Sequence, residues 1–291
     1  RFNPVFSQRK SIFIYPLISN YKKYSLQIFN TGKAFIHLKK NDPQYTKGGY
    51  KSFSRSIEFD TLKTYAVLTF PFDSESHLQK AKNELSVMDL VDSKSKYNLP
   101  YLNYDITYGK KNGLYINKLS FISELYDKDL RSFLKEHKSS FEETLSLSKK
   151  MLLAVKELHS YGIIHNDIKA QNFLVRKGLK YLVLTDYGLS QQMGNVNFGD
   201  GISGTRGYID INYCLSRVRS GYSYRSFSEG VSGDIFSLGM TIYKGFFQNL
   251  ILASLVKDIN YLAMPKKNTA RASIRFIESR VREYGLSHIT L

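Results

Sequence analysis

The feature that most constrains the fold of this chain is a run of polar residues between apolar segments, His165-Asn166-Asp167-Ile168-Lys169-Ala170-Gln171-Asn172. Short β-type runs precede and follow it, at residues 163–164, 173–175 and 181–185, with a turn at Lys177-Gly178. A second polar triplet, Asp186-Tyr187-Gly188, comes directly after the last run. We therefore expect the two polar segments to occupy neighbouring turns of one strand-and-turn unit.

These residue types suit phosphoryl transfer. That reaction needs an acceptor hydroxyl oriented by a carboxylate, a cation on the transferring group, and metal ions that hold the phosphates. Asp167, Lys169 and Asn172 meet these needs from one loop, and Asp186 adds a second carboxylate for the metal. A single Asp in a loop is usually a turn former or a helix cap, but four polar residues in this register favour the catalytic interpretation.

Several segments resemble the protein-kinase superfamily. HNDIKAQN is similar to the catalytic-loop pattern H-R-D-x-K-x-x-N, and DYG is similar to D-F-G. Gly204-Thr205-Arg206-Gly207-Tyr208 resembles the end of an activation segment, and residues 232–243 resemble the buried central helix of the larger lobe. The resemblance implies an α+β, two-lobed protein-kinase-like fold. Residues 1–122 would form a small antiparallel β-sheet lobe with one helix, and residues 123–291 a larger, mainly helical lobe.

The resemblance also implies roles for single residues, with ATP and Mg²⁺ as cofactors and a protein as substrate. Asp167 would orient the acceptor hydroxyl and take its proton, and Lys169 would stabilise the γ-phosphoryl. Asn172 and Asp186 would bind Mg²⁺. The position of Lys169 is typical of Ser/Thr kinases. His165 would be structural, and Asp234 would hold the backbone of the catalytic loop.

Asn166 stands where most regulated kinases of the family have Arg. It removes the cation that would pair with a phosphorylated activation loop. We therefore expect activity that does not require phosphorylation of that loop. Asp210-Ile211-Asn212 replaces the family's A-P-E, so the Glu of a buried ion pair is absent there.

The first half of the chain departs from the family pattern at the nucleotide site. Residues 28–36, taken as the equivalent of the glycine-rich loop, contain one Gly. Tyr65-Ala66-Val67-Leu68 aligns with V-A-I-K, so Leu68 replaces the phosphate-binding Lys whose partner would be Glu84. Lys63 has the opposite strand parity to Leu68, which leaves Lys33 as the better surrogate for binding ATP.

These departures resemble the secreted rhoptry and dense-granule kinases of apicomplexan parasites, a branch with active kinases and inactive pseudokinases. The resemblance implies a secreted parasite compartment or a host-directed protein. Two hypotheses follow. The first is a Ser/Thr protein kinase that uses Mg-ATP, and the second is a pseudokinase that binds nucleotide or acts as a scaffold or regulator.

Composition excludes other classes. The single Cys214 cannot form an intramolecular disulfide or a thiolate metal cluster. Lys+Arg 42 against Asp+Glu 25 gives a net charge of +17, but the cations occur as scattered pairs without a nucleic-acid-binding motif, so we expect no nucleic acid. The charge instead favours acidic protein substrates or peripheral contact with a membrane surface. No apolar run is long enough to span a bilayer, and the oligomeric state stays open.

Apolar periodicity predicts the remaining elements. The helix after Leu68 should begin with a Ser76/Gln79 capping box and bury Leu78, Ala81, Leu85 and Met88. We interpret His37, His77, His137, His159 and His288 as ordinary core or surface residues. The expected strands are 24–29, 34–38, 56–59, 64–70 and 113–121. A helix over 140–158 should begin with Ser140 and Glu143 in capping-box register and turn Leu145, Leu152, Val155 and Leu158 inward. The other expected helices are 128–137, 234–247 buried on every side, and 272–284, with a long loop at 188–207.

Overall fold

The computed structural model describes residues 13–14, 24–28, 33–38, 46–47, 51–72, 75–91, 95–111, 114–193, 203–214, 226–247 and 256–257. The chain divides into two compact units. Unit 1 comprises residues 1–88, 92–94 and 99–126, and unit 2 comprises residues 89–91, 95–98 and 127–291. The main division falls after Tyr126, a few residues beyond the expected boundary at 122–123.

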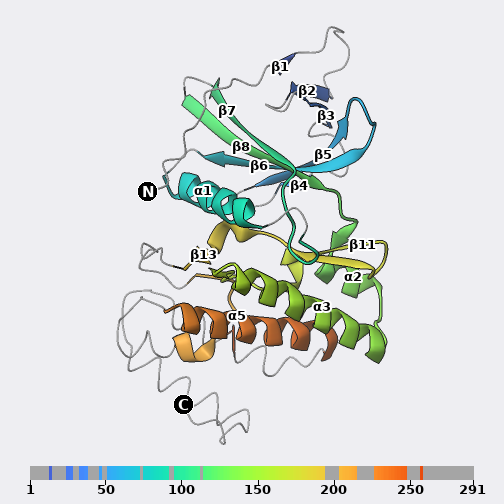
Figure 1. Cartoon of the computed structure of the whole chain (residues 1–291), viewed down its shortest axis with the longest axis vertical. Coiled ribbons are helices and arrows are strands. Elements are labelled where there is room, and N and C mark those ends of the chain that lie inside the picture. Colours follow the sequence, from blue (N-terminus) through green and yellow to red (C-terminus); the bar gives the residue numbers. More distant parts are fainter. Residues whose placement is uncertain are drawn as a thin grey trace, which may run out of the picture. The chain divides into compact units, whose positions relative to one another are not determined.

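Unit 1 is built on an antiparallel sheet with the strand order β1-β2-β3-β5-β6-β8-β7, and β4 pairs with β5 outside this path (Figure 1). The strands are β1 (Phe13–Ile14), β2 (Tyr24–Ile28), β3 (Ala34–Leu38), β4 (Thr46–Lys47), β5 (Ser52–Glu58), β6 (Thr64–Phe72), β7 (Asn103–Lys111) and β8 (Leu114–Glu124). Phe35 of β3, Tyr65 and Val67 of β6, and Ile122 of β8 form a buried cluster. The rings of Phe35 and Tyr65 meet edge to face, with centroids 5.7 Å apart.

One helix, α1 (Glu75–Leu90), follows β6. It begins before Ser76, so the predicted capping box at Ser76 is wrong. Its buried positions include Ala81, Glu84, Val87 and Met88. Glu84, the partner expected for the lysine that Leu68 replaces, is therefore fully buried.

The apolar pattern does not predict β7, and it predicts a strand at 56–59 where β5 spans Ser52–Glu58. The residues of β7, NYDITYGKK, are mostly polar and do not alternate. In the described sheet β7 lies at the end of the strand order and pairs only with β8. A strand at the edge of a sheet can carry more polar residues than a central strand. The apolar periodicity of the sequence therefore does not reveal β7.

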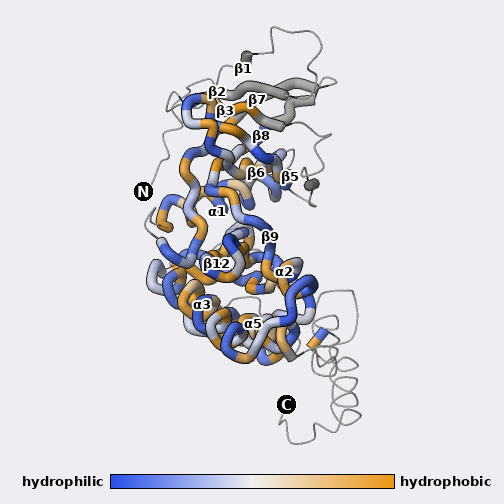
Figure 2. The backbone as a smooth tube through the Cα atoms, turned by 90° about the vertical axis from the view of Figure 1, so that its right-hand side faces the viewer, coloured by the Kyte–Doolittle hydropathy of each residue, from blue (hydrophilic) through white to orange (hydrophobic). Residues whose placement is uncertain are grey.

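Unit 2 combines helices with short strand pairs (Figure 1). The helices α3 and α5 pack against each other, and Figure 2 shows hydrophobic and hydrophilic residues interleaved along both. Strands β9, β11 and β12 form one small sheet, and β10 pairs with β13. The bounds are α2 (Leu130–Glu136), α3 (Phe141–Ser160), α5 (Phe227–Ile242), the π-helical turn η3 (Tyr243–Phe247), the 3-10 turns η1 (Ala170–Asn172) and η2 (Tyr187–Leu189), and the strands β9 (Lys128–Asp129), β10 (Ile163–Ile164), β11 (Phe173–Arg176), β12 (Tyr181–Leu184) and β13 (Gln191–Gln192).

Side-chain caps set where these helices begin. The predicted capping box of α3 is confirmed, because the Ser140 side chain accepts from the Glu143 N–H and Glu143 accepts from the Ser140 N–H. Ser226 and Glu229 form the same box on α5. This second box starts α5 at Phe227, well before the predicted residue 234. Asp129 caps α2, so the residues expected to open that helix form β9 instead.

Two predicted burial patterns are wrong in part. Leu145 and Leu152 of α3 are 62% and 49% exposed, whereas Val155 and Leu158 are buried as predicted. The buried face also carries Leu147, Met151 and Ala154. The helix α5 is not buried on every side, since Ile235 is 46% exposed and lies on a stripe with the exposed Ser232 and Gly239.

The turn at Lys177-Gly178 is confirmed, with φ angles of +53° and +65°. The predicted loop at 188–207 contains η2 and β13, and the latter pairs with β10. Residues 194–202 of that loop and the predicted helix at 272–284 lie outside the described residues. Among the described helices, none combines the length and apolar character that a membrane span requires.

Candidate active site

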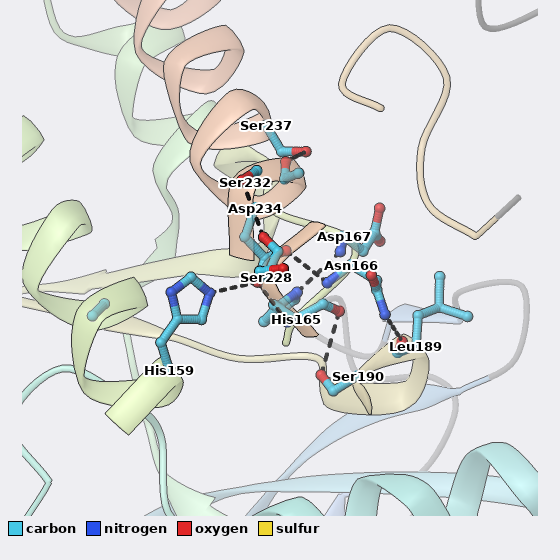
Figure 3. A network of polar contacts seen from close by, with 12 residues as sticks. His159, His165, Asn166, Asp167, Leu189, Ser190, Ser228, Ser232, Asp234 and Ser237 are labelled. Atoms are coloured by element: carbon cyan, nitrogen blue, oxygen red, sulfur yellow. Dashed lines mark hydrogen bonds and ion pairs between the residues drawn. The ribbon is translucent and has the colours of Figure 1, made fainter. Parts of the chain in front are cut away.

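The catalytic-loop segment is anchored to α5 by one buried carboxylate (Figure 3). Asp234 Oδ2 accepts from the His165 backbone N–H at 2.7 Å, and Oδ1 accepts from the Asn166 N–H at 2.8 Å. His159 Nε2, from the end of α3, lies 2.9 Å from Asp234 Oδ2. These bonds fix the start of the loop relative to α3 and α5, as the resemblance implied for Asp234.

His165 is fully buried and links the two polar segments. Its Nδ1 accepts from the Asp167 N–H at 3.2 Å, which assigns the ring proton to Nε2. Nε2 then donates to the Thr185 carbonyl at 3.1 Å, directly before Asp186. The ring also meets Tyr187, with centroids 5.8 Å apart. Both ring nitrogens are used within the fold, which supports the structural role predicted for His165.

Asn166 has a left-handed backbone with φ +65°. Asn tolerates this region better than most residues, and its side-chain Nδ2 donates to the Leu189 carbonyl at 3.0 Å. Gly204, with φ +117°, approaches the same residue so closely that an added Cβ would lie 2.6 Å from the Asn166 oxygen. Only glycine fits this contact between the loop and the Gly204–Tyr208 segment.

The carboxylate of Asp167 accepts a hydrogen bond from a side-chain hydroxyl group. Thr205 Oγ1 donates to Asp167 Oδ1 at 2.6 Å. Lys169 Nζ lies 2.6 Å from Asp167 Oδ2 and 2.8 Å from Thr205 Oγ1. The structure thus brings together the predicted pair Asp167 and Lys169 around an alcohol oxygen.

Asn172 and Asp186 lie at adjoining positions of the same unit. The Thr185 N–H donates to the Asn172 carbonyl at 2.9 Å, which brings the residue before Asp186 against Asn172. Asn172 Nδ2 donates to the Asp167 carbonyl at 2.8 Å, so the amide oxygen is the atom left for a cation. Asp186 has φ +73°, at the turn where β12 ends. An amide and a carboxylate oxygen at adjoining turns fit a hard cation such as Mg²⁺.

In unit 1, Lys33 forms an ion pair with Glu58. Lys33 Nζ lies 2.7 Å from Glu58 Oε1, and the side chains are 58% and 4% exposed. The Tyr65 hydroxyl donates to the same carboxylate at 3.3 Å, and Thr61 also donates to it. The Lys33 hydrogen bond holds the pKa of Glu58 below its usual value, and Glu58 raises the pKa of Lys33.

Leu68 and Glu84 lie on consecutive elements, β6 and α1, as the alignment with V-A-I-K predicted. Leu68 pairs with Phe53 of β5 and Phe121 of β8 in the middle of the sheet. The nearest preceding glycine pair, Gly48-Gly49, stands in the sequence between the paired residues Lys47 and Ser52 of β4 and β5. Residues 28–36, predicted from the sequence as the equivalent of the glycine-rich loop, begin in β2 and end in β3, the preceding strand pair.

Two functional contacts escaped sequence reasoning. Thr205 was recognised only as part of a segment, and nothing in the local pattern joins it to Asp167 across the intervening residues. His159 is predicted to be an ordinary core or surface residue, but its Nε2 lies 2.9 Å from Oδ2 of the buried Asp234. Its position in the last turn of α3, shortly before the loop, is the signal that could have indicated the contact.

A two-unit α+β chain whose Asp-x-Lys-x-x-Asn loop adjoins a second Asp has the architecture of a phosphotransferase of the protein-kinase type. The family description "Protein kinase domain" matches residues 44–283. This chain therefore belongs to the protein kinase family and has its two-lobed α+β fold. The match begins beyond residues 28–36 and Lys33, the segment proposed as the nucleotide loop.

The curated relatives are mainly serine/threonine kinases. The chain is 27% identical over 199 residues to the probable serine/threonine-protein kinase fhkC of Dictyostelium discoideum, covering 67% of this chain and 31% of that protein. It is 26% identical over 248 residues to serine/threonine-protein kinase MPS1 of Saccharomyces cerevisiae, covering 75% and 31%. It is 34% identical over 137 residues to stress-activated protein kinase jnk-1 of Caenorhabditis elegans, covering 46% and 28%. The chain spans less than a third of the length of these relatives.

Proposed function

We propose that this chain is a catalytically competent Ser/Thr protein kinase that transfers the γ-phosphoryl group of ATP to a hydroxyl of a protein substrate. The observation that carries the proposal is the contact of Thr205 with Asp167 and Lys169. A side-chain hydroxyl donates to the carboxylate at 2.6 Å while its oxygen accepts from the ammonium at 2.8 Å. The loop therefore has the charges and spacing to orient an alcohol.

The same contacts support a separate role for each of the two residues. The Asp167 carboxylate accepts the proton of the attacking hydroxyl, so the oxygen becomes a better nucleophile. Lys169 places a positive charge beside that oxygen, where negative charge from the phosphoryl group develops. The bond from Asn172 Nδ2 to the Asp167 carbonyl holds the loop in this conformation.

Asn172 and Asp186 would hold Mg²⁺, which neutralises the phosphate charge of ATP when bound. The donor oxygens fit this ion, because the Asn172 amide is oriented by Asp167 and Asp186 follows a strand bonded to Asn172. Loss of the metal-binding residues is a common sign of an inactive kinase, and both residues are present in this chain.

A second candidate function is that of a pseudokinase, a nucleotide-binding scaffold or regulator. It is favoured by Leu68, which occupies the place of the family's phosphate-binding Lys. The partner of Lys33 that the structure describes is Glu58. We favour catalysis because the residues that orient the hydroxyl and suit the metal are in register.

The test replaces the base. Asp167→Asn keeps the size of the side chain but removes the charge that accepts the proton, so we expect phosphate transfer to a generic protein acceptor to fall by about 10²- to 10⁴-fold. Asp127→Asn is the matched control, because its carboxylate accepts the Lys177 N–H in an exposed turn. Equal transfer by native chain and Asp167→Asn would contradict the proposal.

Lys33→Met tests the surrogate lysine separately. If Lys33 binds the ATP phosphates, the variant loses ATP turnover, as measured by ADP release. Glu58→Gln is the companion variant, since it removes the ion pair but keeps the cation. Turnover that persists in Lys33→Met would exclude Lys33 from the nucleotide site while leaving the role of Asp167 intact.

A further inference from the structure

A group of cations lies beside the Gly204–Tyr208 segment of unit 2. Lys244, on the π-helical turn η3, donates from Nζ to the Gly207 carbonyl at 2.6 Å. The same ammonium lies 3.8 Å from the centroid of the Tyr208 ring. A Cβ added to Gly207 would lie 2.8 Å from Lys244 Nζ and 3.6 Å from Lys257 Cβ. Lys244 and Lys257 therefore both pack on the backbone of this segment.

The group carries positive charge that the described residues do not neutralise. None of the described carboxylates forms an ion pair with Lys244, Lys257 or Arg131. The carboxylate nearest in the sequence, Asp210, accepts the Asn212 N–H. Burial, together with the smaller effects of the Lys257 and Arg131 charges, lowers the pKa of Lys244 to about 8. An anion placed here would relieve this mutual repulsion.

The group also lies near the acceptor-binding carboxylate. The Thr205 hydroxyl donates to Asp167, and Tyr208 lies one turn further along the chain from Thr205. Burial raises the pKa of the Tyr208 phenol, Arg131 opposes that shift, and Asp167 adds to it. Both charges thus act on the same ring. The Tyr208 ring therefore contacts Lys244 and is also within electrostatic reach of Asp167.

We propose that Lys244 and Lys257 form a recognition site for an anionic side chain that flanks the acceptor residue of a protein substrate. The proposal deepens the kinase function and rests on it. A carboxylate or phosphate on the substrate would pair with Lys244 over the Tyr208 ring, while the acceptor hydroxyl replaces that of Thr205 at Asp167. A substrate with a cationic residue beside its acceptor would be repelled by Lys244 and Lys257, and this difference would give specificity.

The experiment compares two short peptides with a single serine, one flanked by glutamates and the other by lysines. We expect the glutamate peptide to be phosphorylated with at least about tenfold higher kcat/KM, corresponding to one well-placed ion pair of about 1.4 kcal/mol. Lys257→Glu, at an exposed position, should reduce the preference, and Lys244→Glu should abolish or reverse it. Lys156→Glu, on the exposed side of α3, makes the same charge change away from the group and should leave the preference unchanged.

A binding measurement separates this inference from the proposed function. Peptides with alanine in place of serine are titrated without ATP and followed by fluorescence anisotropy. If the glutamate peptide binds and Lys244→Glu and Lys257→Glu weaken it, the site is supported even when no phosphate transfer is found. Transfer without a preference, or a preference that survives both variants, would overturn the inference while the kinase function stands. The inference also fails if neither peptide binds, or if the native chain carries its own phosphate and removing it opens peptide binding.

Discussion

At the residue scale, a few buried polar groups determine the geometry of the site. Asp234 is 1% exposed and accepts from two backbone N–H groups and a histidine of neighbouring elements. Its assignment came from resemblance, because an Asp at the start of an apolar helix segment carries no local signal of what it binds. The left-handed backbone conformations of Asn166 and Asp186 likewise could not be predicted from the sequence. Local propensity cannot show which residues long-range contacts hold in such conformations.

Replacing Asp234 tests this anchor. Asp234→Ala leaves the buried N–H groups of His165 and Asn166 without their acceptor, at a cost of about 1–3 kcal/mol each. Urea unfolding should show the loss in the free energy of unfolding. Asp234→Asn keeps one acceptor oxygen and should lose less. Asp127→Ala, at an exposed turn, should cost below about 1 kcal/mol, and a similar loss in both alanine variants would refute the anchor role.

Glu58 gives the prediction on pH. Its folded pKa lies below the ordinary value of 4.5, chiefly through the hydrogen bond from Lys33. The unfolded chain therefore binds more protons than the folded chain below that value. This stabilisation is fully present above pH 4.5 and is lost as the pH falls through the lowered folded pKa. Thermal unfolding from pH 3 to pH 7 should show a smaller acid loss in Glu58→Gln, and identical profiles would contradict the assignment.

At the element scale, segments with strong local signals were predictable and segments fixed by packing were not. The capping box of α3 and the Lys177-Gly178 turn are local, and the structure confirms both. The edge strand β7 and the paired strand β13 were missed, because pairing to another segment defines them. The inward face of α3 was predicted correctly for Val155 and Leu158 and wrongly for Leu145 and Leu152, since apolar residues at helical spacing occur on both sides of that helix.

The two glycines of α5 make a matched pair at this scale. A Cβ on Gly230 would lie 2.2 Å from Ile164 Cδ1 and 2.9 Å from Ile164 Cγ1, in buried surroundings. Gly230→Ala should therefore cost about 1–3 kcal/mol of stability through overpacking. No atom lies within 4 Å of a Cβ on Gly239, so Gly239→Ala should stabilise the helix by about 0.5–1 kcal/mol.

Chemical denaturation measures both changes. Ile164→Val in the Gly230→Ala background should recover part of the loss, because it removes the atom closest to the new Cβ. Equal effects of the two alanine substitutions would show that helix propensity alone governs α5 and that its close approach to β10 does not matter.

At the scale of the whole molecule, the family and the α+β two-lobed fold could be predicted from the catalytic-loop and D-Y-G segments alone. The nucleotide site could not be predicted in the same way. Leu68 stands at the position of the family's lysine, and the ion pair of Lys33 with Glu58 depends on the pairing of β3 with β5. Part of the net charge of +17 lies beside the Gly204–Tyr208 segment, in Lys244 and Lys257.

The most direct test of the central claim is phosphate transfer from Mg-ATP by the native chain and by Asp186→Ala. Removing the carboxylate that would hold Mg²⁺ should abolish transfer to a protein acceptor while the far-ultraviolet circular dichroism and thermal unfolding of the chain stay close to native. Chelation of Mg²⁺ should give the same loss in the native chain. Transfer that is the same in the native chain and in Asp186→Ala, or absent from both, would contradict the kinase account.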